Sequence, residues 1–329
     1  MQLAIKRMNS VLAILVVLVL GCAGFASAAT VLKTNHSVLP THAYHLGALR
    51  FADLVKERTK GEVIIDVLHS AQLGAERESI EALQLGTLDL TICSTAPLIG
   101  FTKSFMAFDL PFIFLDRAMA FRVLDGPIGQ KALAEIEKNN IVGLAFFENG
   151  FRQVTNSKLP IVTPGDLKGL KIRTMENKIH MASFKAVGAN PTPMAFGEVF
   201  TALQQKTVDG QENPMSLIYD GKYYEAQKYI SMTGHFYAAA PLLMSKRSFS
   251  KLTPEQQQIV REAAKEATSF QRSLMKEQDD KAMEGLKANR MEFTEVDKKV
   301  WRDAMDVVYK QFEKEIGADM IKAIQAEAK

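Results

Sequence analysis

From residue 30 onward, apolar residues follow two different periods along the chain. Residues 30–35, 63–68 and 88–94 are short strand-like runs, and 63–68 is rich in β-branched side chains. Residues 44–58 and 76–85 instead repeat apolar side chains every three or four positions, which is the period of an amphipathic helix. Strands that alternate with helices in this order predict parallel pairing, with the helices covering the sheet.

The alternation continues to residue 244 and is followed by a helical tail. The further elements that the pattern predicts are a mostly helical 117–139, strand 141–147, extended segment 150–155, turn 163–166, strand 170–173, helix 178–187, extended link 190–193, helix 195–205, strands 229–233 and 238–244, and helices 300–316 and 318–326. Between them, a helical pattern runs from Pro254 to about Lys287, with Thr253 as its N-cap. We expect so long a helix, placed after two α/β units, to contact both of them.

The first 29 residues have the three parts of a secretory signal peptide. A positively charged start precedes ten unbroken apolar residues, 11–20, and the small-residue sequence 26–28 follows them. The apolar run is too short to span a bilayer, which takes roughly 20 residues. We therefore expect cleavage near Ala28 or Ala29 and export of the mature protein, and lipid attachment at Cys22 is the alternative.

Composition and charge narrow the function classes. With 47% hydrophobic and 23% charged residues, the chain is too apolar to be disordered. Its formal net charge is only +3, and two of the positive charges, those of Lys6 and Arg7, lie in the leader. A protein that neutralises nucleic-acid phosphates needs a larger basic excess, so we exclude nucleic-acid binding. Removal of the leader leaves Cys93 as the remaining cysteine, which cannot form an intramolecular disulfide.

Motifs for catalysis or for a cofactor are missing from the sequence. It contains no glycine-rich phosphate loop and no G-x-S-x-G nucleophile elbow. His42 and His45 could share a metal, but no acidic or sulfur ligand lies nearby in sequence, so we interpret them as an exposed helix face. The pair Asp279-Asp280 is interpreted as solvated surface of a charged helix. A secreted α/β chain of this kind indicates a binding protein with no cofactor, no metal and no enzymatic activity.

Seven segments carry a resemblance to a known family. They are Gln72–Gly74 with Glu76-Arg77, Gly86–Asp89, Phe108–Phe112, Phe151-Arg152, Asp166–Arg173, Gly188–Met194, and Glu198–Gln205 leading into Val208–Pro214. Together they resemble the solute-binding subunit of TRAP transporters, the DctP-type periplasmic receptors. The resemblance covers essentially all of 30–329, and its motifs stand in the family's order.

The resemblance implies a two-lobed α/β periplasmic binding protein, type II-like, with crossing hinge strands and a long helix that spans both lobes. Lobe one would comprise 30–149 and 237–278, and lobe two 150–236 and 279–329. It also implies a monomer that captures a small organic acid and delivers it to the membrane subunits of a TRAP permease. A ligand-sensing subunit for a membrane receptor is the alternative, and an enzyme of the same fold would need an acid and a base that we do not recognise.

Arg173 is the principal candidate contact for the ligand. It matches the family's arginine that grips a ligand carboxylate through two parallel hydrogen bonds, a task suited to a planar, permanently charged guanidinium. The alternative is a surface strand residue that pairs with Glu176 or Asp166. Glu176 is itself included among the candidate ligand contacts.

Five further residues match ligand-facing positions of the family. Arg152 matches its second arginine, and Asn213 matches a position whose amide reaches the carboxylate. Phe196 matches an aromatic residue that packs on the ligand, with plain helix core as the alternative. Asn35 and His36 end the first strand, where relatives place a polar contact and where open α/β sheets bind ligands.

Two positions bear on the choice of ligand. Glu76 matches a site where some relatives accept hydrogen bonds from ligand hydroxyls, which favours a hydroxylated ligand over a second carboxylate; an acid that complements the helix dipole is the alternative. Ser94 replaces the glutamate of sialic-acid-binding relatives and argues against that ligand. We expect a sugar acid such as a uronate or aldonate. A four-carbon dicarboxylate (succinate, malate or fumarate) is the alternative, with its second charge on Arg152, His36 or His180.

Overall fold

The computed structural model describes residues 28–328, so most of the predicted leader, including Cys22, lies outside the described residues. Within this range, two sheets share one long strand, β4 (Ile141–Asn156). The first sheet has the order β2 (Val63–Leu68), β1 (Thr30–Asn35), β3 (Leu90–Ile92), β9 (Tyr237–Ser245) and the first part of β4. Parallel pairing of β1 with β2 and with β3 confirms the prediction, whereas β9 and β4 are antiparallel to their neighbours.

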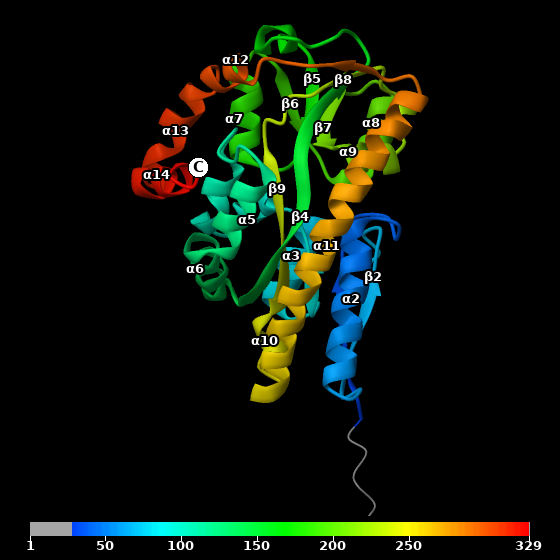
Figure 1. Cartoon of the computed structure of the whole chain (residues 1–329), viewed down its shortest axis with the longest axis vertical. Coiled ribbons are helices and arrows are strands. Elements are labelled where there is room, and N and C mark those ends of the chain that lie inside the picture. Colours follow the sequence, from blue (N-terminus) through cyan, green and yellow to red (C-terminus); the bar gives the residue numbers. More distant parts are fainter. Residues whose placement is uncertain (1–27, 329) are drawn as a thin grey trace, which may run out of the picture.

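The second sheet is built on the last part of β4. Its further strands are β7 (Gly210–Pro214) and β8 (Tyr229–Ser231), which pair with β4, β5 (Lys171–Thr174) and β6 (Asn190–Pro193), which follow β7, and β10 (Glu292–Thr294), which pairs with β8. In Figure 1, β4 and β9 run through the middle of the molecule between the two groups of elements. This arrangement confirms the predicted α/β fold with strands that cross between two halves.

Helices and short 3₁₀ turns cover both sheets. They are α2 (Ala43–Arg58), α3 (Glu76–Leu85), α4 (Thr95–Leu98), η1 (Lys103–Asp109), α5 (Arg117–Asp125), α6 (Pro127–Glu135), η2 (Ile136–Asn139), η3 (Pro164–Leu167), α7 (Lys178–Ala186), η4 (Phe196–Glu198), α8 (Val199–Gln204), α9 (Met215–Asp220), η5 (Tyr223–Glu225), α10 (Lys246–Phe249), α11 (Pro254–Ala288), α12 (Lys298–Asp303), α13 (Asp306–Ile316) and α14 (Ala318–Gln325). Helix α3 ends at Gly86 with φ of 72°, a left-handed conformation that glycine adopts without strain. Among residues 28–328, no helix is both long enough and apolar enough to cross a membrane.

Helix α11 connects the two halves, as the sequence predicts. It has 35 residues, and the side chains of Thr253 and Gln256 form a reciprocal capping box at its start. Its first half packs on α2 and β4, and its second half packs on α9 (Figure 1). Val260 and Ala264 belong to the apolar core of the first sheet, whereas Ala282 and Leu286 belong to a core beside the second sheet. One helix is therefore buried against both halves.

Strand β4 is a single strand, whereas the sequence predicts two separate segments, 141–147 and 150–155. It runs without interruption through residue 149, with irregular pairing to β9 between Gly143 and Ala145 and again between Glu148 and Gly150. Gly150 has φ of 108°, which a residue with a side chain rarely adopts. The glycine predicted to begin a separate extended segment is therefore a bulge within one strand.

Asp279 is not solvated surface, which corrects half of the interpretation of the Asp279-Asp280 pair. Arg117 forms ion pairs with Asp279 and with the buried Glu148, whose Oε1 lies 2.6 Å from the Arg117 Nε. Asp279 also accepts a hydrogen bond from the backbone N–H of Ser216. Asp279 of α11 therefore contacts residues of α5 and α9. Its neighbour Asp280 is exposed.

The two histidines at the start of α2 are buried, not exposed as expected. His42 is the N-cap and accepts the backbone N–H of Tyr44 at 3.2 Å. His45 stacks edge-on against His36, with ring centroids 5.3 Å apart. Burial lowers the pKa of His42 to about 3, so its ring is neutral at pH 7. Among the residues that the structure describes, no group of three or more His, Cys, Asp or Glu side chains is arranged to hold a metal.

Gly47 of α2 lies close to Gln271 of α11 and generates a stability prediction. A Cβ at Gly47 would lie 2.8 Å from the Gln271 Cβ and 2.9 Å from the Phe147 Cε2. We expect Gly47→Ala to lower the free energy of unfolding by about 1–3 kcal/mol, because overpacking outweighs the helix propensity of alanine. Urea unfolding measures this change. The control Gly197→Ala, where no atom lies within 4 Å, should cause little change; equal effects would contradict the packing argument.

Candidate ligand-binding site

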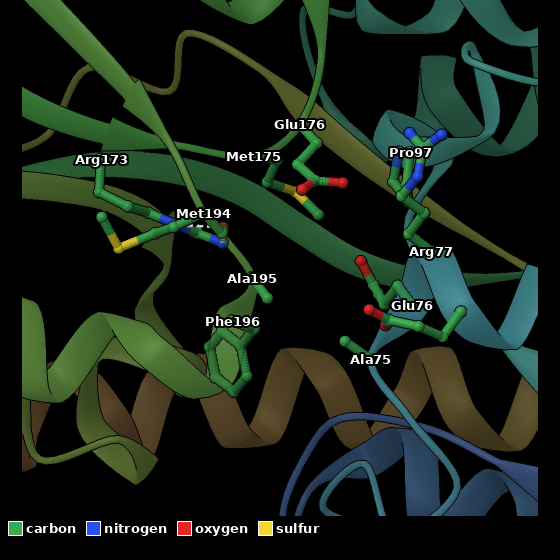
Figure 2. A pocket seen from close by; sticks show the side chains of 11 residues that line it. Ala75, Glu76, Arg77, Pro97, Arg173, Met175, Glu176, Met194, Ala195 and Phe196 are labelled. Atoms are coloured by element: carbon green, nitrogen blue, oxygen red, sulfur yellow. Dashed lines mark hydrogen bonds between the residues drawn. The ribbon is translucent and has the colours of Figure 1, made fainter.

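A pocket lies where the start of α3 faces the ends of β5 and β6. Figure 2 shows Arg173 reaching in from one side, Glu76 facing it from α3, and Phe196 closing the pocket between them. The residues that line the pocket are Ala75, Glu76, Arg77, Glu78, Pro97, Arg173, Met175, Glu176, Met194, Ala195 and Phe196. Four candidates from the sequence, Glu76, Arg173, Glu176 and Phe196, therefore meet in one place.

Arg173 is buried with part of its hydrogen-bonding capacity unused. It is 1% exposed near the end of β5, and its Nε and Nη2 donate to the Met194 carbonyl oxygen at 3.1 and 2.8 Å. Its Nη1 has no hydrogen-bond partner among residues 28–328. Burial lowers the pKa of Arg173. Tyr223, Glu212 and Glu76 raise this pKa and so offset part of the effect. The alternative role as a surface residue paired with Glu176 or Asp166 is wrong, because the side chain is buried and bonds to neither.

Glu76 presents a carboxylate to the same pocket. It is the first residue of α3 and half-buried, and its Oε1 accepts the backbone N–H of Ser94 at 2.8 Å. Burial raises the pKa of Glu76, while that hydrogen bond and the positive charges of Arg173 and Arg152 lower it in part. Glu76 is thus both the first residue of α3 and a residue that lines the pocket. Ser94 itself is buried, caps α4, and holds Glu76 instead of lining the pocket.

Arg152 is fully buried in an ion pair with Glu212 and does not line the pocket. Its Nε and Nη2 both bond to the Glu212 carboxylate, the second at 2.9 Å. His235 adds a hydrogen bond to Glu212 at 3.3 Å. Burial opposes ionisation of Glu212, but Arg152 and His235 outweigh it and hold the pKa of Glu212 well below its usual range. The Nη1 of Arg152 has no partner within the described part of the chain.

Asn213 belongs to the same network. Its Oδ1 accepts from the Arg152 Nη2 at 3.0 Å, and its Nδ2 donates to the Gln211 Oε1 at 2.5 Å. Both ends of the amide therefore have protein partners, and the expected contact of Asn213 with a ligand carboxylate stays a prediction.

Asn35 and His36 lie at the end of β1 but do not line the pocket. The Asn35 amide donates to the Gly74 carbonyl oxygen at 2.9 Å and to the Ser79 hydroxyl at 2.8 Å, which fixes the loop that precedes α3. The His36 ring lies 3.1 Å from the His45 ring, measured from Nε2 to Nδ1. In this structure, Asn35 supports the position of Glu76 from behind, and His36 belongs to a histidine cluster.

Phe196 lies where the two halves meet. It is half-buried in η4 and packs against the apolar cores on both sides of the pocket. The alternative of plain helix core is therefore too narrow, because the ring also lines the pocket. Glu176 is exposed at the pocket rim (Figure 2).

Sequence reasoning missed three buried residues near these groups. Glu212 stood inside a quoted motif, but nothing in the pattern indicated that it pairs with Arg152, 60 residues away. Tyr223 is 2% exposed, and Arg173 and Arg152 counteract the rise in its pKa that burial causes. Tyr44 is 1% exposed, and the sequence indicated it only as the first residue of a predicted helix. Only the fold brings Glu212 to Arg152 and buries the two tyrosines.

Comparison with known proteins identifies the family. The family model described as bacterial extracellular solute-binding protein, family 7 (DctP), matches residues 34–315. The chain belongs to this family. The match covers β4, α11 and the other strands of both sheets except the first four residues of β1, and it includes the pocket residues described above.

Solved and curated relatives of the chain are full-length matches. The 2,3-diketo-L-gulonate-binding periplasmic protein of Escherichia coli is 38% identical over 311 residues, which is 92% of this chain and 95% of that protein. A TRAP periplasmic solute-binding protein of Polaromonas sp. JS666, bound to D-erythronate, is 44% identical with a TM-score of 0.89, covering 90% of this chain and 98% of that one. One from Sulfurospirillum deleyianum, bound to succinate, is 35% identical with a TM-score of 0.86, covering 91% and 99%.

These matches establish the general class of the protein. It is a TRAP-type solute-binding protein with the two-lobed fold of that family, and its relatives are periplasmic. The family and the structural neighbours are solute receptors and not enzymes. The pocket between α3 and the second sheet is therefore the candidate ligand site of a member of this family.

The buried pair of Arg152 and Glu212 generates a prediction for stability and its pH dependence. We expect Glu212→Gln to lower the free energy of unfolding at pH 7 by about 3–5 kcal/mol, because it leaves a buried guanidinium unpaired. The pKa of Glu212 lies below its ordinary value of 4.5. The stabilisation is therefore fully present above about pH 4.5 and is lost as the pH falls further.

Urea unfolding of both proteins between pH 7 and pH 3.5 measures this difference. The control Glu266→Gln removes an exposed partner of Arg50 and Arg58 and should change stability little at any pH. A difference for Glu212→Gln that stays constant down to pH 3.5 would contradict the assigned charge state.

Proposed function

We propose that this protein captures a monocarboxylate sugar acid of the aldonate or uronate type in the periplasm and delivers it to a TRAP permease. Its two lobes close on the ligand at the strands that cross between them. In this proposal Arg173 is the primary carboxylate contact, Arg152 the second, and Glu76 accepts hydrogen bonds from ligand hydroxyls. Phe196 packs on the carbon chain.

The observation that carries the proposal is the unsatisfied guanidinium of Arg173. A buried arginine that keeps one nitrogen without a partner pays a desolvation cost that an anion in the pocket would offset. Carboxylates are the anions whose two oxygens match the guanidinium fork. The unpartnered Nη1 of Arg152 supports a second contact to the same anion.

The charges that line the pocket favour one carboxylate over two. Three acids, Glu76, Glu78 and Glu176, stand against the arginines Arg77 and Arg173. Arg77 is half-exposed and paired with Glu81 at 3.2 Å, and Arg152 is already neutralised by Glu212. A ligand with a second carboxylate would meet acidic side chains, whereas ligand hydroxyls can donate to them.

The ligands of relatives support the same class. The named ligands include D-erythronate and 2,3-diketo-L-gulonate, which are sugar acids. Succinate also occurs within the family, so a four-carbon dicarboxylate remains the competing ligand. The pocket charges of this chain favour the sugar acid.

The remaining parts of the proposal concern export and the lobes. The leader pattern at residues 1–29 and the periplasmic relatives support export with cleavage near Ala28 or Ala29. We place lobe one at 30–149 with 237–278, and lobe two at 150–236 with 279–329. The change of partner along β4, from β9 up to Phe151 to β7 from Arg152, supports a border near residue 150.

The first test uses D-erythronate and succinate on the mature wild-type protein and on Arg173→Lys. We expect D-erythronate to raise the melting temperature of the wild type more than succinate does, because binding to the folded state stabilises it. In Arg173→Lys we expect at least about a 30-fold loss of affinity by calorimetry, since lysine keeps the charge but not the forked geometry.

A matched variant and the unfolding curve separate binding from folding. Arg302→Lys makes the same exchange on the exposed side of α12 and should retain wild-type affinity. Arg173→Lys should still unfold cooperatively. Near-normal affinity in a folded Arg173→Lys protein would refute the carboxylate clamp, and preference for succinate would replace the sugar acid with a dicarboxylate.

Glu76 yields a separate prediction about selectivity and pH. We expect Glu76→Gln to weaken D-erythronate more than succinate, because the carboxylate accepts hydroxyl protons but repels a second carboxylate. The pKa of Glu76 lies above its ordinary value of 4.5, so its carboxylate form is lost at a higher pH than usual as acid is added. Calorimetry at pH 7.5 and pH 5 should show weaker D-erythronate binding at pH 5 in the wild type only. Equal losses for both ligands would reduce Glu76 to a helix-start residue.

A further inference from the structure

We propose that Asn177 sets the separation between Arg173 and Glu76 and thereby determines the chain length of the acid that the protein prefers. The inference rests on the proposed function, in which Arg173 holds the ligand carboxylate and Glu76 accepts a hydroxyl. It adds a positioning residue behind the pocket. The basis is a buried hydrogen-bond network that joins the wall carrying Glu76 to the wall carrying Arg173.

The Asn177 side chain uses all of its hydrogen-bonding capacity. It is the N-cap of α7 and 2% exposed, and its Oδ1 accepts the backbone N–H groups of Ile179 and His180 at 2.8 and 3.0 Å. Its Nδ2 donates to the Ala96 carbonyl oxygen at 3.1 Å and to the Asp109 Oδ2 at 3.0 Å. A side-chain amide offers two donor hydrogens and two acceptor lone pairs, and here each has a partner. The amide is therefore fixed in one orientation.

The two ends of this amide bond to different halves of the molecule. Its oxygen caps α7, which packs on β5 and β6 of the second sheet. Its nitrogen bonds to α4 and η1, which pack on β9 of the first sheet. Thr95 of α4 also donates to the Asp109 Oδ1 at 2.9 Å, and Asp109 is 2% exposed. Asn177 therefore joins the two halves at a buried position.

On the side of the first sheet, the network continues to Glu76. The Ala96 N–H donates to the Ser94 Oγ at 3.4 Å, and the Ser94 N–H donates to the Glu76 Oε1 at 2.8 Å. Pro97, the residue after Ala96, lines the pocket. The wall that presents the Glu76 carboxylate is therefore linked through Ser94 and Ala96 to the amide of Asn177.

On the side of the second sheet, the backbone itself makes the connection. Met175 and Glu176 directly precede Asn177 and line the pocket (Figure 2). Arg173 is four residues before Asn177, near the end of β5. The Asn177 N–H donates to the Met175 carbonyl oxygen at 2.8 Å, which closes a tight turn between β5 and α7. The position of Arg173 is therefore tied to that of Asn177.

A fixed separation between Arg173 and Glu76 selects ligands by length. In the proposed complex the carboxylate lies on Arg173 and a hydroxyl reaches Glu76, so the carbon chain between them must fit the distance that Asn177 maintains. An acid that is one carbon shorter or longer satisfies only one end. We expect affinities of neighbouring chain lengths to differ by at least about tenfold, as is usual for one carbon unit in a specific site.

The test measures affinity by calorimetry for four aldonates of increasing length, D-glycerate, D-erythronate, D-ribonate and D-gluconate. Asn177→Asp keeps a capping oxygen on α7 but places a second carboxylate against Asp109 and an acceptor against the Ala96 carbonyl oxygen, so the two walls move apart. We expect the wild type to show the tenfold preference for one length. In Asn177→Asp we expect at least about a tenfold loss for that acid, and a preference reduced to below about threefold.

The double variant Asp109→Asn with Asn177→Asp tests whether the bond itself is responsible. The amide is then on η1 and donates to the carboxylate on α7, so we expect the length preference to return. The control Asn190→Asp removes an amide donor that bonds to the Gly169 carbonyl oxygen, also at 3.1 Å, within the second half. It should keep the affinity and the preference of the wild type.

The outcomes separate the inference from the proposed function. If Asn177→Asp weakens all acids by the same factor, or the double variant behaves like the single one, Asn177 is only structural and the inference is overturned. If the wild type binds all four lengths alike, the inference is overturned, although the sugar-acid function stands. If the wild type binds none of them, the aldonate form of the proposed function fails together with the inference. Thermal unfolding checks each variant, and Asn177→Ser, which keeps a capping oxygen on a shorter side chain, replaces an Asn177→Asp protein that does not fold.

Discussion

The simultaneous pairing of β4 with two sheets is the constraint on which the rest of the structure depends. Its first part pairs with β9 and its last part with β7 and β8, so one strand sets the relative position of both halves. The bulge at Gly150 lies at this transition, and the ion pairs of Arg117 with Glu148 and Asp279 tie it to α5 and to α11. The candidate site inherits its geometry from this crossing, because Arg152 is the first residue of β4 to pair with β7.

The two buried arginines illustrate different solutions to the same electrostatic problem. Arg152 is neutralised within the fold by Glu212, which makes it a permanent part of the second sheet at any pH where that carboxylate is ionised. Arg173 bonds to a carbonyl oxygen and forms no ion pair with any residue of the described chain, so its charge is solvated only in part. Desolvation without a counter-charge is expensive, and a paired charge is much less so. Both arginines are buried, but Arg152 has a counter-charge within the fold and Arg173 has none in the described chain.

The periodic pattern predicts most of the fold because it reports burial directly. Strands β1 and β2 and helix α3 agree with their predicted limits, and α11 is as long as its uninterrupted pattern indicates. The prediction breaks down where polar residues are buried by pairing with each other: β7 reads as a polar motif, yet each of its residues is buried. For the site, the motifs brought Arg173, Glu76 and Phe196 together, but they could not show that Asn35 is used to hold a loop or that Asn177 bonds across the two halves. Hydrogen-bond partners distant in sequence are properties of the tertiary fold, and no local pattern encodes them.

Ligand capture and lobe closure become linked if the lobes close around Arg173. In an empty closed cleft its unpaired charge would lie in a medium of low dielectric constant, which disfavours closure without an anion. A carboxylate removes that penalty and adds the two parallel hydrogen bonds that the fork provides, so the bound anion shifts the equilibrium toward the closed state. Arg152 contributes little to this linkage, since Glu212 neutralises it with or without a ligand. Glu76, by contrast, lines the pocket with a carboxylate. In the proposed complex it would repel the carboxylate of the ligand, and the hydroxyl groups of the ligand would lie toward α3. In the proposed mechanism, one unpaired cation therefore drives capture, and one nearby acid sets the direction in which the captured molecule lies.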